Sequence, residues 1–116
     1  MKLSSIEDNF SYEGVQDVDP TEVFEKLSNL VLVDVRQPEE FSGELGHVPG
    51  SKLIVLDTLP EKASEIPKDQ TVVLICRSGA RSARATAFLK SQGFTEVYNM
   101  KGGMLLWNEL RLKTEG

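Results

Sequence analysis

The sequence predicts an α/β fold in which helices cover both faces of one parallel sheet. Segments with helix-start signals alternate along the chain with short apolar runs. Apart from Asp34 and Thr71, the central runs at residues 30–35 and 71–76 are apolar throughout, and they lack the two-residue alternation of a strand with one face in water. The 116 residues can bury one core, so we expect a single domain over residues 1–116, with its core at about 15–112.

The first half of the chain is expected to start with a strand at residues 15–18. Asp19 and Pro20 then offer an N-cap and a proline at the first helical position, which predicts a helix to about residue 28. A buried strand is expected at 30–35. Gln37-Pro38-Glu39-Glu40 repeats the helix-start pattern, but this second helix must be short because three glycines and a proline lie within residues 43–51.

The second half continues the alternation. Strands are expected at residues 52–56, 71–76 and 96–100, and helices at residues 60–65, 82–92 and 103–112. The helix at 60–65 has weak signals, whereas Gly93 is a natural left-handed C-cap for the helix before it. No internal repeat or linker divides the chain.

Charge is distributed unevenly in this acidic protein, whose formal net charge is -5. Residues 1–75 hold 15 acidic and 6 basic side chains, whereas residues 76–116 hold 3 and 7. Basic residues gathered around one cysteine, with no basic surface stripe, favour a small anion over nucleic acid as the partner.

The sequence also bears on location. No apolar run is long enough for a membrane span, and residues 1–10 have no signal-peptide pattern. The chain has a single cysteine, and an unpaired thiol is better tolerated in a reducing compartment. We therefore expect a cytoplasmic protein.

Cys76 opens the most informative segment, Cys76-Arg77-Ser78-Gly79-Ala80-Arg81-Ser82. It ends an apolar strand, and the carboxyl ends of strands in an open α/β sheet face the ligand crevice. A short loop that closes onto a helix N-terminus turns backbone N–H groups toward its centre, where they can hold an anion such as a thiolate.

A lone free cysteine is more often a buried structural residue. Here two arginines and two serines follow within six residues, and such side chains are poor candidates for core packing. We therefore interpret Cys76 as a nucleophile.

Four motifs in order resemble the rhodanese family, over residues 15 to 112. They are the Cys76–Ser82 loop, Leu32-Val33-Asp34-Val35-Arg36-Gln37-Pro38-Glu39-Glu40-Phe41, Gly46-His47-Val48-Pro49-Gly50-Ser51, and Lys101-Gly102-Gly103 followed by Trp107. The resemblance implies a five-stranded parallel sheet in the order 1-5-4-2-3. It also places Asp34 and Arg36 on one flank of the cysteine loop, and Lys101 and Gly102 on the other.

The resemblance further implies a sulfurtransferase. Members of this family take a sulfane sulfur from thiosulfate or a similar small anionic donor, hold it as a cysteine persulfide, and pass it to cyanide or a thiol, protein thiols included. Cys76 would be the nucleophile, and residues Arg77, Ser78, Gly79, Ala80, Arg81 and Ser82 would bind the donor. No metal or organic cofactor is expected.

Two alternatives stay open. The protein could be a persulfide carrier or regulatory module that exchanges sulfur with another protein. It could also be one of the phosphatases or arsenate reductases that share the fold, although these place arginine six positions after the cysteine, where this chain has Ser82. The arginine here is Arg81, and the shorter loop favours sulfur chemistry.

Other polar residues are interpreted as structural. His47, the only histidine, is expected to tie its turn to neighbouring backbone. Asp34 is expected to fix nearby loop amides, and Arg36 to pair with Glu39 or Glu40. Met104 and Trp107 are expected in the core, and Arg84 and Lys90 in solvent. Arg77 and Arg81 could also form structural ion pairs instead of binding the donor.

Overall fold

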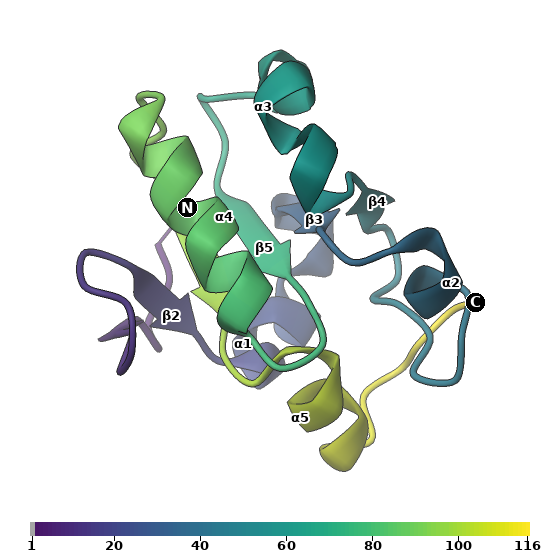
Figure 1. Ribbon diagram of the computed structural model, residues 1–116. Coiled ribbons are helices and arrows are strands. Elements are labelled where there is room, and N and C mark those ends of the chain that lie inside the picture. The colour runs from purple at the N-terminus through teal and green to yellow at the C-terminus, as the bar shows by residue number, and fades with distance from the viewer. Residues whose placement is uncertain (1) are drawn as a thin grey trace.

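The computed structural model describes residues 2–116, which form a six-stranded sheet with helices on both faces (Figure 1). The strand order is β1-β2-β6-β5-β3-β4. The strands are β1 Glu7–Asp8, β2 Gln16–Val18, β3 Val31–Asp34, β4 Lys52–Leu53, β5 Val72–Ile75 and β6 Val97–Met100. All neighbouring strands pair in parallel except β1 with β2. From β2 to β4 the sheet therefore has the order 1-5-4-2-3, as predicted.

The added strand β1 was not predicted. Its two residues are exposed and acidic, so they carry no apolar pattern. A turn centred on Asn9 forms the hairpin: Asn9 Oδ1 accepts hydrogen bonds from the backbone N–H groups of Ser11 and Tyr12, and Asn9 Nδ2 donates to Asp17. An asparagine side chain that accepts hydrogen bonds from the backbone two and three residues further on stabilises a turn of this kind.

The helices are α1 Pro20–Glu25, α2 Pro38–Phe41, α3 Leu59–Lys62, α4 Ala80–Ser91 and α5 Gly103–Glu109. Asp19 caps α1 as predicted, because its side chain accepts from the Thr21 N–H. The helices predicted at 19–28 and 60–65 are α-helical over only part of their length. A 3-10 turn at Leu27–Asn29 follows α1, and another at Ala63–Glu65 follows α3. Gly93 has the predicted left-handed conformation, with φ of 96°.

Two cores lie on opposite faces of the sheet. On one face, side chains of β3 and β5 pack under α3 and α4, with Leu59 and Leu89 among the buried residues. On the other face, α1 and α5 cover the sheet, and Met104 and Trp107 are fully buried as predicted. The strands between them are therefore apolar on both sides, which explains their lack of alternation.

No helix within residues 2–116 is long and apolar enough to cross a membrane.

Glu22 in α1 fastens the N-terminal segment to the domain. Its carboxylate accepts hydrogen bonds from the backbone and hydroxyl groups of Ser4 and Ser5 and pairs with Lys26 at 2.6 Å. Burial raises the pKa of Glu22, but these hydrogen bonds outweigh it and hold the pKa well below its usual range.

We therefore expect Glu22→Gln to lower the free energy of unfolding by about 1–3 kcal/mol at neutral pH. Because the folded-state pKa of Glu22 lies below its unfolded value, this contribution is present above that unfolded value and is lost as the pH falls through the acid range. Denaturant titrations of both proteins at pH 7 and near pH 3 would check this. A difference that stays constant between the two pH values would contradict the ionic role.

Candidate active site

Cys76 lies at the carboxyl end of the central strand β5, and only 1% of its surface is exposed. The loop turns at once, and the backbone N–H of Gly79 reaches back to Cys76 Sγ at 3.0 Å. Gly79 has φ of 103°, which disfavours any residue with a Cβ and explains the glycine in this tight loop. Within residues 2–116, the Gly79 N–H is the one backbone amide that donates to Cys76 Sγ. The sequence had predicted that several loop N–H groups would point to the sulfur.

Helix α5 holds the cysteine loop from the other side. The N–H groups of Met104 and Leu105 donate to the carbonyls of Cys76 and Arg77 at 2.8 and 2.9 Å. A Cβ on Gly103 would lie 2.5 Å from those same two carbonyl oxygens. The Gly102-Gly103 pair therefore allows the helix to start directly against the loop, which positions the backbone of Cys76.

A buried polar chain that the sequence did not predict leads away from the sulfur. Ser82 Oγ lies 3.2 Å from Cys76 Sγ and also bonds to Asn99 Oδ1. Asn99 Nδ2 in turn donates to Asp17 Oδ1 at 2.9 Å. Asp17 and Asn99 are direct partners across β2 and β6, so the sheet register fixes this contact. The one feature of the sequence that could have indicated this polar chain is Asn99, an amide side chain within the buried strand β6.

Arg81 forms a two-pronged ion pair with Glu40 of α2, at 2.7 and 2.8 Å. The Arg81 guanidinium lowers the pKa of Glu40 to about 2, and the same contact raises the pKa of Arg81. The structure thus shows the ion-pair alternative for this residue. Arg77, by contrast, is exposed and forms no ion pair in the described part of the chain.

The Arg81–Glu40 pair gives a testable expectation. With thiosulfate, the donor that the resemblance implies, we expect Arg81→Ala to lower kcat/KM by roughly tenfold, because the loop loses the bond that joins it to α2. Arg84→Ala should have little effect, since Arg84 is exposed on the helix surface.

Glu40→Ala separates two explanations for that loss. If the pair acts by holding the loop, Glu40→Ala should resemble Arg81→Ala in steady-state kinetics. Improved donor use in Glu40→Ala would instead mean that a freed Arg81 binds the donor directly.

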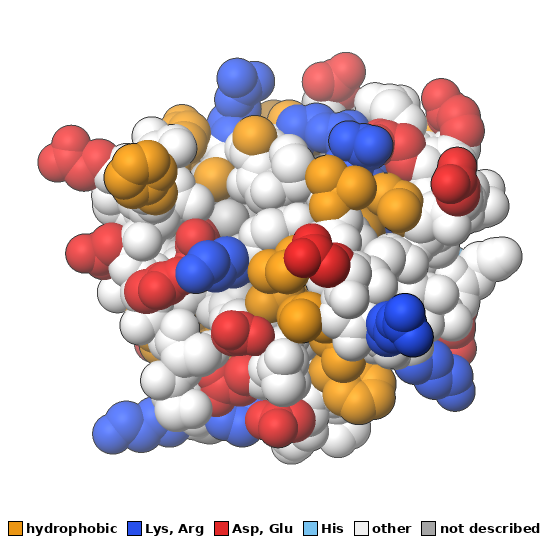
Figure 2. All heavy atoms as spheres, turned by 90° about the horizontal axis from the view of Figure 1, so that it is seen from below, with side chains coloured by type: hydrophobic (Ala, Val, Ile, Leu, Met, Phe, Trp, Pro, Cys, Tyr) orange, Lys and Arg blue, Asp and Glu red, His pale blue; other side chains and the backbone are white. Residues whose placement is uncertain are grey.

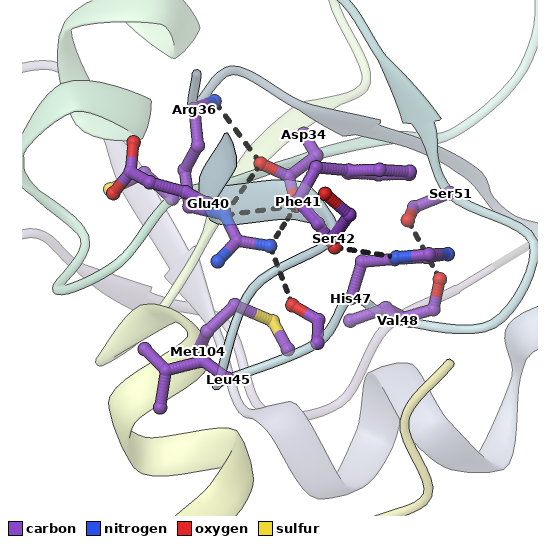
Figure 3. Close-up of polar contacts among 12 residues, drawn as sticks. Asp34, Arg36, Glu40, Phe41, Ser42, Leu45, His47, Val48, Ser51 and Met104 are labelled. Atoms are coloured by element: carbon purple, nitrogen blue, oxygen red, sulfur yellow. Dashed lines mark hydrogen bonds and ion pairs between the residues drawn. The ribbon is translucent and has the colours of Figure 1, made fainter. Parts of the chain in front are cut away.

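The prediction that Arg36 pairs with Glu39 or Glu40 was wrong. Arg36 is 1% exposed and bonds to the buried carboxylate of Asp34, with Nη2 at 2.8 Å, and to the carbonyl of Gly46 at 2.7 Å (Figure 3). Asp34 also accepts from the backbone N–H of Arg36, as predicted for a carboxylate that fixes a turn. On this flank of the cysteine loop, Asp34 and Arg36 therefore form a buried ion pair with a structural role.

The other flank divides into two. Gly102 lies against the cysteine loop, since its N is 3.5 Å from a Cβ built on Gly79. The Lys101 side chain instead points to Glu7 of β1 in an exposed ion pair. The charge of Lys101 is therefore paired with Glu7 of the edge strand β1 and does not face the cysteine loop.

His47 has the predicted structural role. Its ring stacks on Phe41 with centroids 3.7 Å apart, and Nδ1 contacts the Phe41 carbonyl at 2.9 Å (Figure 3). Its backbone pairs with Glu115. Lys90 is exposed and reaches the Gly14 carbonyl, so it has no contact with the loop.

Two hollows flank the cysteine loop. One, of about 270 Å³, lies between the loop and the β1–β2 turn and is lined by residues that include Asn9, Tyr12, Asp17, Gly79 and Asn99. The other, of about 230 Å³, is lined by Arg36, Glu39, Glu40, Gly43, Glu44, Leu45 and Arg77. Small molecules can therefore approach the loop from either side.

The surface around α5 is mixed rather than uniformly basic. Figure 2 views the molecule from the side on which α5 lies in Figure 1, and hydrophobic side chains gather in the middle with charged ones around them. Leu105 and Leu110 are among the exposed hydrophobic residues. Two of the basic residues in 76–116, Arg81 and Lys101, pair with acids from the first half of the chain.

Comparisons with known proteins agree with this architecture. The model of the rhodanese-like domain family matches residues 19–110. A sulfurtransferase of Allochromatium vinosum is 38% identical over 96 residues, which cover 80% of this chain and 88% of that protein. The thiosulfate sulfurtransferase GlpE of Ectopseudomonas mendocina is 36% identical over 91 residues, covering 78% and 82%.

A solved structure extends the likeness to the fold. The crystal structure of a rhodanese-related protein from Thermoplasma volcanium superposes with a TM-score of 0.76 at 29% identity, and the match covers 84% of this chain and 94% of that one. The chain belongs to the rhodanese-like family. The names of its relatives support a rhodanese-type sulfurtransferase in general.

Proposed function

We propose that this protein is a sulfurtransferase that carries sulfane sulfur as a persulfide on Cys76. The observation that supports this most is the position of the sulfur, at the carboxyl end of β5 with the Gly79 N–H directed at it. Thiosulfate, or a donor of similar charge and size, is the proposed substrate.

The proposed reaction has two displacement steps. The Cys76 thiolate attacks the outer sulfur of thiosulfate, a Cys–S–S bond forms, and the bond to the sulfonate sulfur breaks with its electron pair leaving as sulfite. A thiol acceptor, as its thiolate, or cyanide then attacks the outer persulfide sulfur and releases the Cys76 thiolate. Neither step needs an oxidant, and because sulfite is a good leaving group we propose no metal or organic cofactor.

Residues Arg77, Ser78, Gly79, Ala80, Arg81 and Ser82 are proposed to bind the donor. Arg77 is the loop arginine without an ion-pair partner in the described residues, so its charge is available to an anion near the hollow that it lines. Arg81 contributes through the pair that fixes the loop to α2. An unpaired cysteine that acts as a thiol is best kept reduced in a reducing compartment, so we propose that the protein is located in the cytoplasm.

Loop length favours sulfur transfer over phosphate chemistry. Cys76 and Arg81 bracket four residues, so the loop is sized for one sulfur atom, whereas a phosphoryl group brings three further oxygens. Donor groups lose their effect when they point away from the developing charge, and a displacement of about 1 Å can cost on the order of a hundredfold in rate.

The test compares the wild type with a variant that has one residue inserted before Arg81. We expect thiosulfate-to-cyanide transfer by the wild type, weaker transfer by the variant, and no turnover of an aryl phosphate or arsenate by the wild type. Phosphatase turnover that disappears in Cys76→Ser would move the assignment to hydrolases of this fold.

A persulfide carrier is the second candidate, because the same residues would serve it. It predicts slow steady-state turnover with thiosulfate and cyanide but rapid exchange of the persulfide with a protein thiol. Measuring both rates on one preparation distinguishes the two roles.

A further inference from the structure

We propose that the hollow between the cysteine loop and the β1–β2 turn binds the sulfur acceptor, and that this acceptor is a small thiol with an ammonium group. Asp17, which lines the hollow, binds the ammonium and so determines which acceptors are preferred. This inference rests on the proposed use of Cys76 as the sulfur carrier. It is supported by the charge of the hollow, by the free carboxylate oxygen of Asp17, by two exposed aromatic rings and by the contact of the hollow with the loop.

The charge of this hollow does not suit a sulfur donor such as thiosulfate. Among residues 2–116, Asp17 is the only charged residue that lines it. The hollow on the other side of the loop includes Arg77, the residue proposed to bind the anionic donor. A carboxylate repels an anion and attracts a cation, so the two hollows are suited to different reactants.

Asp17 is held in place with one carboxylate oxygen left for a ligand. It is 7% exposed, and its Oδ1 accepts hydrogen bonds from Asn9 Nδ2 and Asn99 Nδ2, both at 2.9 Å. Within residues 2–116, Oδ2 has no hydrogen-bond or ion-pair partner. Because no fully buried side-chain oxygen or nitrogen among these residues lacks a partner, Oδ2 must lie on the accessible part of Asp17, at the hollow. An N–H donor of a ligand can bind there.

The surrounding charges also favour a cation. Residues 7–18, which form the β1–β2 hairpin at one edge of the sheet, contain four acidic residues and no basic one (Figure 1). Lys101 is bound to Glu7, and this bond is the main cause of its raised pKa, to which Asp17 also contributes. Lys90 binds a backbone carbonyl of the turn and does not line the hollow.

Two aromatic side chains of the β1–β2 turn line the same hollow. Phe10 is 102% exposed and Tyr12 is 39% exposed, so neither ring is buried in a core. Aromatic rings attract cations and also cover the apolar carbons of a ligand. A volume of about 270 Å³ suits a molecule of a few heavy atoms. A small thiol with an ammonium group meets both conditions.

The hollow reaches the sulfur through the loop. Gly79 lines the hollow, and its N–H donates to Cys76 Sγ at 3.0 Å. Asn99, which also lines the hollow, connects Asp17 with the sulfur through Ser82. An ammonium bound at Asp17 is therefore two side chains away from the sulfur, a span that suits an amine and a thiol within one small molecule.

In the proposed transfer step, the acceptor thiolate attacks the outer sulfur of the Cys76 persulfide. A new S–S bond forms on the acceptor, the bond between the two sulfurs of the persulfide breaks, and its electron pair stays on Cys76 as the thiolate. The ammonium takes no part in these bond changes and only holds the acceptor in position. No oxidant or reductant is consumed.

The test measures transfer from the persulfidated protein to two acceptors of the same size, 2-aminoethanethiol and 2-mercaptoethanol. Intact mass first shows whether Cys76 is loaded, so a failure of the proposed function would appear before any acceptor is added. Asp17→Asn should lower the preference for the ammonium acceptor over the hydroxyl acceptor by roughly tenfold relative to the wild type. The intrinsic reactivities of the two thiols are the same for both proteins and cancel in this comparison.

Asp17→Asn removes the negative charge and little else, because the amide oxygen can still accept from Asn9 and Asn99. Asp8→Asn is the matched control, the same substitution at an exposed acid of β1 that does not line the hollow. It should keep the wild-type preference. An unchanged preference in Asp17→Asn, or an equal loss in Asp8→Asn, would overturn the proposal.

A second measurement uses the wild type alone and needs no sulfur donor. Cys76 is the only cysteine, so its labelling by methanethiosulfonate reagents can be followed by intact mass. The thiolate attacks the sulfenyl sulfur of the reagent, and methanesulfinate leaves. The rate ratio of the 2-aminoethyl reagent to the 2-hydroxyethyl reagent should be roughly tenfold higher for Cys76 than for free 2-mercaptoethanol. Equal ratios would overturn the proposal even if Asp17→Asn does not fold.

Discussion

Cys76→Ser is expected to abolish sulfur transfer while leaving the fold intact. A serine alcohol cannot hold a sulfane sulfur as a thiolate can, and no second cysteine exists in the chain to replace it. The serine hydroxyl would occupy the same position, within reach of the Gly79 N–H and the Ser82 side chain.

Thiosulfate-to-cyanide kinetics and circular dichroism, measured on the same samples, check both halves of this expectation. Native dichroism and thermal unfolding, with transfer reduced to the rate of the reaction without protein, is the expected pattern. Transfer retained by the serine variant would remove Cys76 from the mechanism.

Arg36→Met is expected to have the largest effect on stability, lowering the free energy of unfolding by about 3–5 kcal/mol. The substitution keeps most of the side-chain volume but leaves the fully buried Asp34 carboxylate without its cation. The carbonyl of Gly46 also loses its donor. Denaturant unfolding of the variant and the wild type gives the difference.

The double variant Asp34→Leu/Arg36→Met controls for this interpretation. Removing both charges eliminates the unpaired buried carboxylate, so the double variant should be more stable than Arg36→Met alone. If the double variant were less stable by the sum of the two single changes, the pair would not be coupled. Arg36 would then act mainly through Gly46.

Much of the fold could be predicted because its signals are local. The N-cap Asp19, the left-handed Gly93 and the apolar run of β5 each specify a nearby conformation. Helix ends were less predictable, since α1 and α3 are each followed by a 3-10 turn for which the sequence carries no separate signal. The strand β1 escaped prediction because two exposed acidic residues give no apolar pattern.

The candidate site could be predicted only in part. Cys76 and its loop form one continuous segment, so their chemistry could be inferred from adjacent residues. The partners of Arg36 and Arg81 could not, because arginine side chains are long and several carboxylates lie within reach in sequence. Asn99 and Asp17 are 82 residues apart, and only the pairing of β2 with β6 brings them together.

The most direct measurement is the intact mass of the protein after incubation with thiosulfate, with and without a reductant. A persulfide carried on Cys76 predicts a gain of one sulfur atom that the reductant removes and that Cys76→Ser never shows. A wild-type mass unchanged by thiosulfate, or the same gain in the serine variant, would contradict it.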